Sequence, residues 1–180
     1  MSTTSQGRLE DLPAGQLAER VLRELADLAL ALQRLEDHAD AGLPDGLTEP
    51  DHPSGEQWEA SQVWSHLAEF GSYWLPQLEL IIGTASKGPV PFGRTKSDPH
   101  RIAEIERNRC LSIDHQLAVV KTDIARYARI LATMTTEQWN HLGRHPTLGD
   151  MDLWAFLEHF ATGHYHEHAD QLDLLRDALT

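Results

Sequence analysis

Apolar residues recur every three or four positions through the first part of the chain. Between Ala14 and Asp40 this stripe consists of Leu17, Val21, Leu25, Leu28, Leu32 and Leu35. Positions at this spacing fall on one face of an α-helix, so they predict an amphipathic helix from Ala14 to about Asp40. The polar residues 1–13 before it are expected to be frayed. Residues 41–57 carry glycine or proline at nearly every third position and predict a long connection.

A second helix is predicted over the tryptophan-rich segment that follows. Ser61 is a favourable N-cap residue, and the apolar pattern continues through QVWSHLAEFGSYWLPQLELII. Pro76 lies inside this pattern and is expected to kink or restart the helix, because proline removes one backbone hydrogen bond and its ring clashes with the preceding turn. The next stretch, GTASKGPVPFGRTKSDP, is predicted to be another loop.

The second half of the chain predicts two further long helices. Asp98 and Pro99 fit the cap and the first position of a third helix, which is expected to reach about Ala132. Its candidate core residues are Ile102, Ile105, Leu117, Val120, Ile124 and Leu131. The segment TTEQW predicts a short helical turn, and HLGRHPTLGD predicts a loop. A fourth long helix is predicted to begin at Asp152, which can cap it, and to run nearly to the end of the chain.

These elements together predict the fold class. No segment shows the alternating pattern of a β-strand, and no internal repeat is visible. Four long amphipathic helices with two long connections indicate an all-α four-helix bundle without a sheet. The length of 180 residues suits one domain with a sizeable core, which we place at residues 14–180.

Composition and charge narrow the classes of partner and compartment. The net charge of −13, with histidine counted as neutral, argues against nucleic acid and anionic membrane surfaces as partners. No apolar run reaches the length of a membrane span, and the first residues hold no secretory signal, so a cytoplasmic location is expected. The single Cys110 excludes an intrachain disulfide and fits a reducing compartment. Its position within the third predicted helix indicates an inert, buried thiol.

Histidine is concentrated near the end of the chain, in GHYHEHADQ. A helix turns by about 100° per residue, so His164 and His168 project from one face, and Gln171 follows on that face. His166 points to nearly the opposite side, and His159 also lies well off the face. Two imidazoles at i and i+4 form half of a transition-metal site, and a bundle would supply the third ligand from a facing helix.

The second predicted helix supplies the candidate third ligand, His66 in VWSHLAEF. Its neighbours Val63, Leu67 and Phe70 indicate that this side of the helix turns inward. Glu69, three positions after His66, is an alternative oxygen ligand or a residue that orients the histidine.

The competing interpretation is that these histidines bind nothing, because an HxxxH pair is often only a solvated or packed helix face. The remaining histidines are expected to be surface residues: His38, His52, His100, His115, His141 and His145. The five tryptophans are expected to pack in the core: Trp58, Trp64, Trp74, Trp139 and Trp154. Their number also suggests more aromatic surface than one small core needs, which predicts a homodimer.

The ordered set of motifs resembles the DinB-like (DinB/YfiT) superfamily. The matching residues are His66 with a tryptophan just before it, and then His164, His168 and Gln171 within HYHEHADQ. The resemblance implies a four-helix bundle in which His66, His164 and His168 hold a divalent metal, usually zinc or nickel. Members are similar to S-transferases that use bacillithiol or mycothiol and to mycothiol-dependent maleylpyruvate isomerase, and many form dimers.

The expected function is a metal-dependent enzyme that transfers a low-molecular-weight thiol to an electrophilic small molecule. A divalent ion held by three imidazoles would lower the pKa of a thiol or water in its open position, so no protein nucleophile is needed. Glu69 is the candidate catalytic residue, which would orient a ligand or accept a proton. Three alternatives stay open: a metal-dependent hydrolase, a bundle that binds or sequesters a small molecule without catalysis, and an interaction module in which the histidines are incidental.

Overall fold

The structure, a computed structural model, describes residues 14–51, 55–85 and 88–178, so the prediction for residues 1–13 lies outside the described residues. Helix α1 (Ala14–Asp40) has the bounds that the apolar stripe predicts. Leu28 and Leu35 lie on its inward side and are almost fully buried.

Helix α2 (Ala60–Gly83) carries much of the core, and its N-cap differs from the prediction. Glu59, not Ser61, is the N-cap, and the Gln62 side chain accepts a hydrogen bond from the Glu59 backbone N–H at 3.0 Å. The helix also runs through Pro76 without restarting. Pro76 and Ser72, whose carbonyl loses its partner, are both exposed, so water can replace the missing hydrogen bond.

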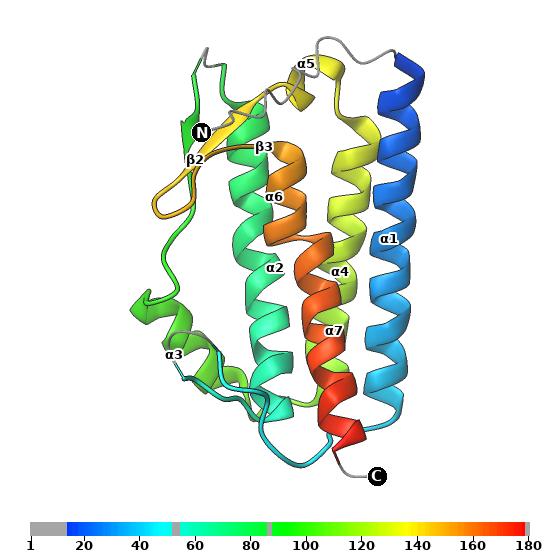
Figure 1. Ribbon diagram of the computed structural model, residues 1–180, viewed down its shortest axis with the longest axis vertical. Coiled ribbons are helices and arrows are strands. Elements are labelled where there is room, and N and C mark those ends of the chain that lie inside the picture. The colour runs from blue at the N-terminus through cyan, green and yellow to red at the C-terminus, as the bar shows by residue number, and fades with distance from the viewer. Residues whose placement is uncertain (1–13, 52–54, 86–87, 179–180) are drawn as a thin grey trace, which may run out of the picture.

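The prediction of one long third helix is wrong, because the segment forms two helices, α3 (Pro99–Asn108) and α4 (Ile113–Thr133). Asp98 caps α3 as predicted and accepts hydrogen bonds from two backbone N–H groups at 2.8 and 3.1 Å. Ser112 gives α4 a cap of its own, which makes a fresh helix start favourable at this point. Helix α3 therefore leaves the bundle and lies beside α2 (Figure 1).

Two side-chain predictions fail as a result of this break. Ile102 lies on the outer side of α3 and is 47% exposed, so it is not a core residue. Cys110 lies between the two helices rather than inside one, and its thiol is exposed. The other candidate core residues of this region are buried or half-buried.

The final predicted helix is also divided, into α6 (Leu153–Phe160) and α7 (Thr162–Asp177). Asp152 caps α6 as predicted, accepting from the backbone N–H of Ala155 at 2.8 Å. Ala161 then leaves the helical conformation, with φ −147° and ψ −102°. The backbone of Gly163 lies so close to α6 that an added Cβ would be 2.2 Å from the carbonyl oxygen of Glu158. This close approach needs glycine, and it sets where α7 begins.

A small sheet stands where the sequence predicts only loops. It consists of β1 (Val90–Pro91), β2 (Leu142–His145) and β3 (Gly149–Asp152), with β1 parallel to β2 and β2 antiparallel to β3. The prediction of a bundle without any sheet is therefore wrong in this detail. Helix α5 (Thr136–Trp139), the predicted short turn, precedes the sheet. The sheet lies at one end of the molecule beside α2 and does not interrupt the bundle (Figure 1).

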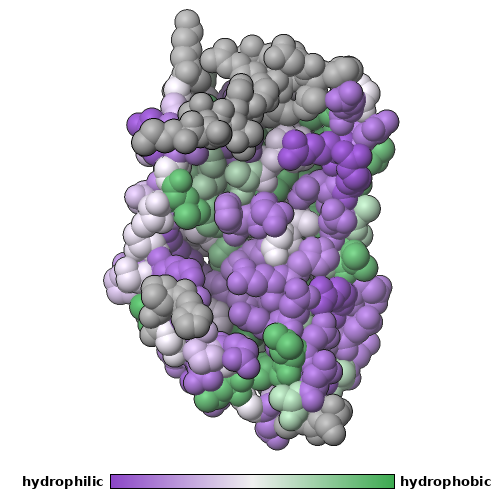
Figure 2. All heavy atoms as spheres, in the orientation of Figure 1, coloured by the Kyte–Doolittle hydropathy of each residue, from purple (hydrophilic) through white to green (hydrophobic). Residues whose placement is uncertain are grey.

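The predicted all-α four-helix bundle is confirmed: α1, α2, α4 and the α6–α7 pair pack around one core. Four of the five tryptophans are buried in it, and only Trp58 is half-buried. None of the helices in the described ranges combines the length and apolar character that a membrane crossing needs. Hydrophilic residues predominate on the face shown in Figure 2, with hydrophobic side chains scattered among them.

Candidate metal centre

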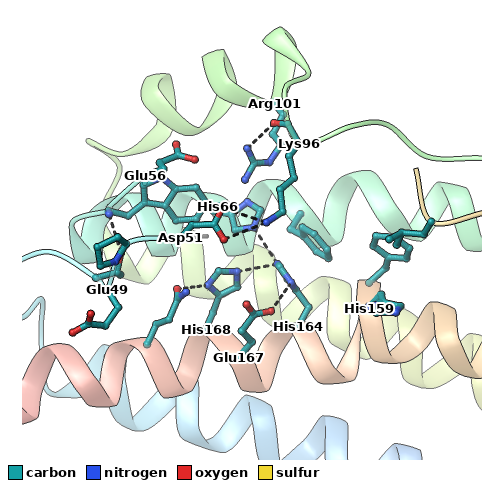
Figure 3. Close-up of a pocket in the computed structure, with 17 residues that line it drawn as sticks. Glu49, Asp51, Glu56, His66, Lys96, Arg101, His159, His164, Glu167 and His168 are labelled. Carbon is teal, nitrogen blue, oxygen red and sulfur yellow. Dashed lines mark hydrogen bonds and ion pairs between the residues drawn. The ribbon is translucent and has the colours of Figure 1, made fainter. Parts of the chain in front are cut away.

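The three histidines that the sequence predicts as metal ligands come together between α2 and α7. His66 extends from α2, and His164 and His168 extend from α7 towards it (Figure 3). The His164 Nε2 atom lies 3.0 Å from the Nε2 atoms of both His66 and His168. Together they form a group whose ligand atoms all lie within 4.8 Å of one another.

The hydrogen positions of these rings favour a cation between them. His168 Nδ1 lies 2.7 Å from Gln171 Oε1, a carbonyl oxygen that only accepts, so Nδ1 carries the hydrogen and Nε2 carries a lone pair. The His164 Nε2 atom can donate to only one of its two neighbours. A divalent ion satisfies all three nitrogens, since tetrahedral zinc with nitrogen bonds near 2.0–2.1 Å separates its ligand atoms by about 3.3 Å.

The surroundings keep the three imidazoles neutral, which is the form that binds metal. Burial is the main cause that lowers the pKa of His66 and of His164 well below the usual histidine value. Burial also lowers the pKa of His168 to about 4, against an opposing hydrogen bond to Gln171. Positive charge on one ring would in addition repel its neighbours. The donor set therefore fits a divalent transition metal.

Oxygen atoms stand behind each ring on the side away from the convergence point. Gln171 contacts His168, Glu69 Oε2 lies 4.0 Å from His66 Nδ1, and Glu167 Oε2 lies 3.7 Å from His164 Nδ1. Hydrogen bonds from the second ring nitrogen fix the orientation of metal-binding histidines, and only the Gln171 contact is short enough to be one. The sequence singles out Gln171 only as a motif position, whereas its place behind His168 gives it this orienting role.

Glu69 is turned away from the pocket. Its carboxylate pairs with the Arg94 guanidinium, which also stacks over the Tyr73 ring at 3.7 Å. Burial raises the pKa of Glu69, and the hydrogen bond from Arg94 opposes this shift. Glu69 is not among the residues that line the pocket. Its position favours orienting His66 over direct ligation, and a catalytic role for Glu69 stays a prediction.

The three histidines open into a pocket of about 500 Å³. The connection between α1 and α2, the start of α3, and the α6–α7 pair form its walls (Figure 3). Aromatic rings hold the imidazoles: Phe70 stacks on His164 with ring centres 3.5 Å apart, and Trp58 contacts His66 edge-on at 4.9 Å. Among the described lining residues there is no cysteine or serine.

Several pocket residues are not identified by sequence reasoning. Trp58, Lys96 and Arg101 reach the pocket from connections and from α3, whose path no periodic pattern fixes. His159 also lines the pocket but belongs to α6 and lies outside the group of three. His166 faces α1, where its Nδ1 lies 3.4 Å from an Arg34 guanidinium nitrogen, as the helical turn predicts.

Two histidines that we expected at the surface are buried. His38 is 6% exposed, and the Arg176 guanidinium donates to its Nδ1 at 3.1 Å. His145 is 5% exposed and bonds through Nε2 to the Arg94 carbonyl at 3.0 Å, which ties the β2–β3 hairpin to the preceding loop. The prediction for these two is wrong because hydrogen-bonding partners from distant segments cover them. His52 lies outside the described residues.

Comparisons with known proteins show that the chain has a known fold. No protein-family model matches the chain, and no curated protein matches it either. A search of solved structures finds YfiT from Bacillus subtilis, described as a probable metal-dependent hydrolase with an unusual four-helix bundle topology. The match has a TM-score of 0.69 at 20% identity and covers 94% of this chain and 91% of YfiT. The chain has the YfiT fold.

The mycothiol-dependent maleylpyruvate isomerase shares this fold, with a TM-score of 0.60 at 16% identity. The match covers 93% of this chain and 63% of the isomerase, so the chain spans less than two thirds of that protein. A second structure of the isomerase, a variant, gives a TM-score of 0.61. The fold that the resemblance implies, a four-helix bundle like that of YfiT, is thus confirmed.

Proposed function

We propose that the chain is a metal-dependent enzyme that transfers a low-molecular-weight thiol to an electrophilic small molecule. The observation that carries the proposal is the convergence of three neutral imidazoles on an open pocket, where the His164 Nε2 atom lies 3.0 Å from the Nε2 atoms of both His66 and His168. A bound divalent ion supplies a positive charge that lowers the pKa of a thiol or water in its open position. The similarity in fold to a mycothiol-dependent isomerase supports the thiol as the incoming group.

The chain's own residues would prepare the site for this chemistry. Gln171 keeps His168 in the tautomer with a free Nε2, and Glu69 and Glu167 stand behind the other two rings. Phe70, Phe160 and Trp58 give the pocket apolar walls that exclude water from a bound substrate. The described lining residues include no cysteine, which agrees with a nucleophile that arrives as a cosubstrate.

The second candidate is a metal-dependent hydrolase. The similarity to YfiT favours it, since YfiT is described as a probable enzyme of this class. Hydrolysis needs a group that takes a proton from water, and His159 and Glu167 both line the pocket. Both residues are exposed, so packing does not fix either side chain in the position that a general base needs. For this reason we place thiol transfer first.

The finer parts of the proposal concern the metal, the thiol, the compartment and the assembly. Zinc and nickel both suit three imidazole ligands, and mycothiol or bacillithiol is the proposed thiol. We propose a cytoplasmic location and a homodimer as well. The number of tryptophans does not support the homodimer, because four of the five are buried within the chain and are not available for an interface.

Turnover by the metal-loaded protein separates the candidates. We would measure conjugation of bacillithiol or mycothiol to monobromobimane, and hydrolysis of 4-nitrophenyl acetate, for the wild type and for the variants His164→Ala and His166→Ala. Thiol transfer predicts conjugation that His164→Ala loses and His166→Ala keeps. Ester hydrolysis with the same dependence would support the hydrolase instead. Metal-loaded protein without turnover in either assay would leave a small-molecule-binding bundle.

A further inference from the structure

One cation on the pocket wall forms no ion pair with a carboxylate of the described residues. Arg101, on α3, lies across the pocket from α7 and is half-buried (Figure 3). Its Nη1 donates to the backbone carbonyl of Lys96 at 3.1 Å. Among the described residues, no carboxylate oxygen lies within 4.0 Å of its guanidinium. A partly buried charge without an opposite charge beside it destabilises the folded protein unless a ligand supplies that opposite charge.

The neighbouring cations are engaged elsewhere. Arg94 pairs with Glu69, and Lys96 Nζ lies 3.4 Å from both carboxylate oxygens of Asp51. Burial lowers the pKa of Arg101, and Glu56, Glu69 and Asp51 oppose this shift only from beyond contact distance. The guanidinium therefore keeps N–H donors for a ligand in the pocket, in the planar arrangement that matches a carboxylate.

Arg101 is close to the predicted metal ligands. Its Cζ lies 5.5 Å from the centre of the Trp58 ring, and that ring stacks towards His168 with centres 6.2 Å apart. About one ring thus separates the guanidinium from the imidazoles. A small molecule in a pocket of about 500 Å³ can reach both at once.

We propose that Arg101 binds a carboxylate group of the substrate, while the reacting end of the same molecule faces the Nε2 atoms of His66, His164 and His168. The place of the reacting end rests on the proposed function, whereas the carboxylate contact needs no metal ion. Phe70, Phe160 and Trp58 would enclose an apolar body between the two ends. The exposed Glu49 and Glu56 at the pocket disfavour ligands with several negative charges, so the substrate class is an apolar monocarboxylate.

The test compares a carboxylate with its uncharged analogue. Binding of phenylacetate and of phenylacetamide would be measured by ligand-observed NMR titration, with metal-loaded and with chelator-treated protein. The variants are Arg101→Gln, Arg101→Lys and, as a matched control on the same helix, Arg107→Gln. Arg107 pairs with Glu104 and does not line the pocket. Circular dichroism would check that each variant is folded.

The wild type should bind phenylacetate roughly ten-fold more tightly than phenylacetamide, with or without metal. Arg101→Gln should abolish this preference, Arg101→Lys should retain part of it, and Arg107→Gln should leave it unchanged. Equal binding of the two ligands by the wild type, or an unchanged preference in Arg101→Gln, overturns the inference. A preference that depends on Arg101 in protein that binds no metal would support the inference and contradict the proposed function.

Discussion

The Nε2 atoms of His66 and His164 lie 3.0 Å apart, although 98 positions separate the two residues in the chain. The contact joins α2 to α7 beside the pocket. His168, one turn further along α7, completes the group of three histidines. Burial holds the imidazoles in the neutral form, so their lone pairs are available to a shared cation.

Replacing His164 with alanine should remove most of the bound metal, because two imidazoles make a weak site. His166→Ala should leave the metal content unchanged, since its side chain contacts Arg34 on the other side of α7. Elemental analysis of protein purified without a histidine tag gives the metal content of both variants. Retention of metal by His164→Ala together with its loss from His166→Ala would show that the facial assignment is wrong.

Gln171→Ala should weaken metal binding by about 10- to 100-fold, because His168 loses the acceptor that fixes its tautomer. Gln171→Glu, which keeps an acceptor oxygen, should bind metal nearly as well as the wild type. Competition with a chromophoric chelator measures both affinities. Glu167→Gln is the control, and its effect should be smaller because Glu167 is 65% exposed and 3.7 Å from His164 Nδ1. An affinity of Gln171→Ala equal to the wild-type value would remove the orienting role.

Gly163→Ala should lower the free energy of unfolding by about 1–3 kcal/mol, because the new methyl group would meet the Glu158 carbonyl oxygen at 2.2 Å. The strain should also displace the start of α7 and with it His164, so metal affinity should fall. Urea denaturation measures the stability. Gly83→Ala is the matched control, since nothing lies within 4 Å of its added Cβ. Equal stability of the two variants would mean that the α6–α7 junction accommodates a side chain.

Asp123 should make the folded state less stable as the pH rises. Burial raises the pKa of its carboxyl, and the hydrogen bond from Ser72 at 3.0 Å opposes this shift. The folded state then binds the proton more tightly than the unfolded state, whose pKa is near 3.9, so stability falls as the pH rises from that value through the folded pKa. Asp123→Asn should gain stability relative to the wild type over this range. Urea midpoints of both proteins, measured at pH 4 and at pH 7, test this; a difference between the proteins that is the same at both pH values would contradict it.

Local rules explain which parts of the site the sequence predicts. His164 and His168 share a face because of helical spacing alone, and the apolar neighbours of His66 place it inward. The α6–α7 junction was not predicted, because LEHFATGHYH contains no proline and only Gly163 hints at a close approach. The β2–β3 hairpin was not predicted from the sequence. One inward position of β2 is Gly143, which has no apolar side chain, so β2 lacks the alternation of apolar and polar residues that marks a strand.

The rest of the pocket depends on long-range packing. Trp58 and Arg101 meet at the histidines only because the first connection and α3 fold against α2. No spacing along the chain encodes that meeting, and a single arginine near a helix start has no distinguishing sequence pattern. Their place in the pocket could be found only from the packed chain.

Anomalous diffraction from a crystal of the metal-loaded protein tests the central claim most directly. Data collected at the zinc and nickel absorption edges would locate the ion and identify it. We predict one peak at roughly 2.0–2.2 Å from the Nε2 atoms of His66, His164 and His168, with a further coordination position open to the pocket. A fully loaded crystal whose peak lies elsewhere, or protein that takes up no ion at these three residues, would contradict the account.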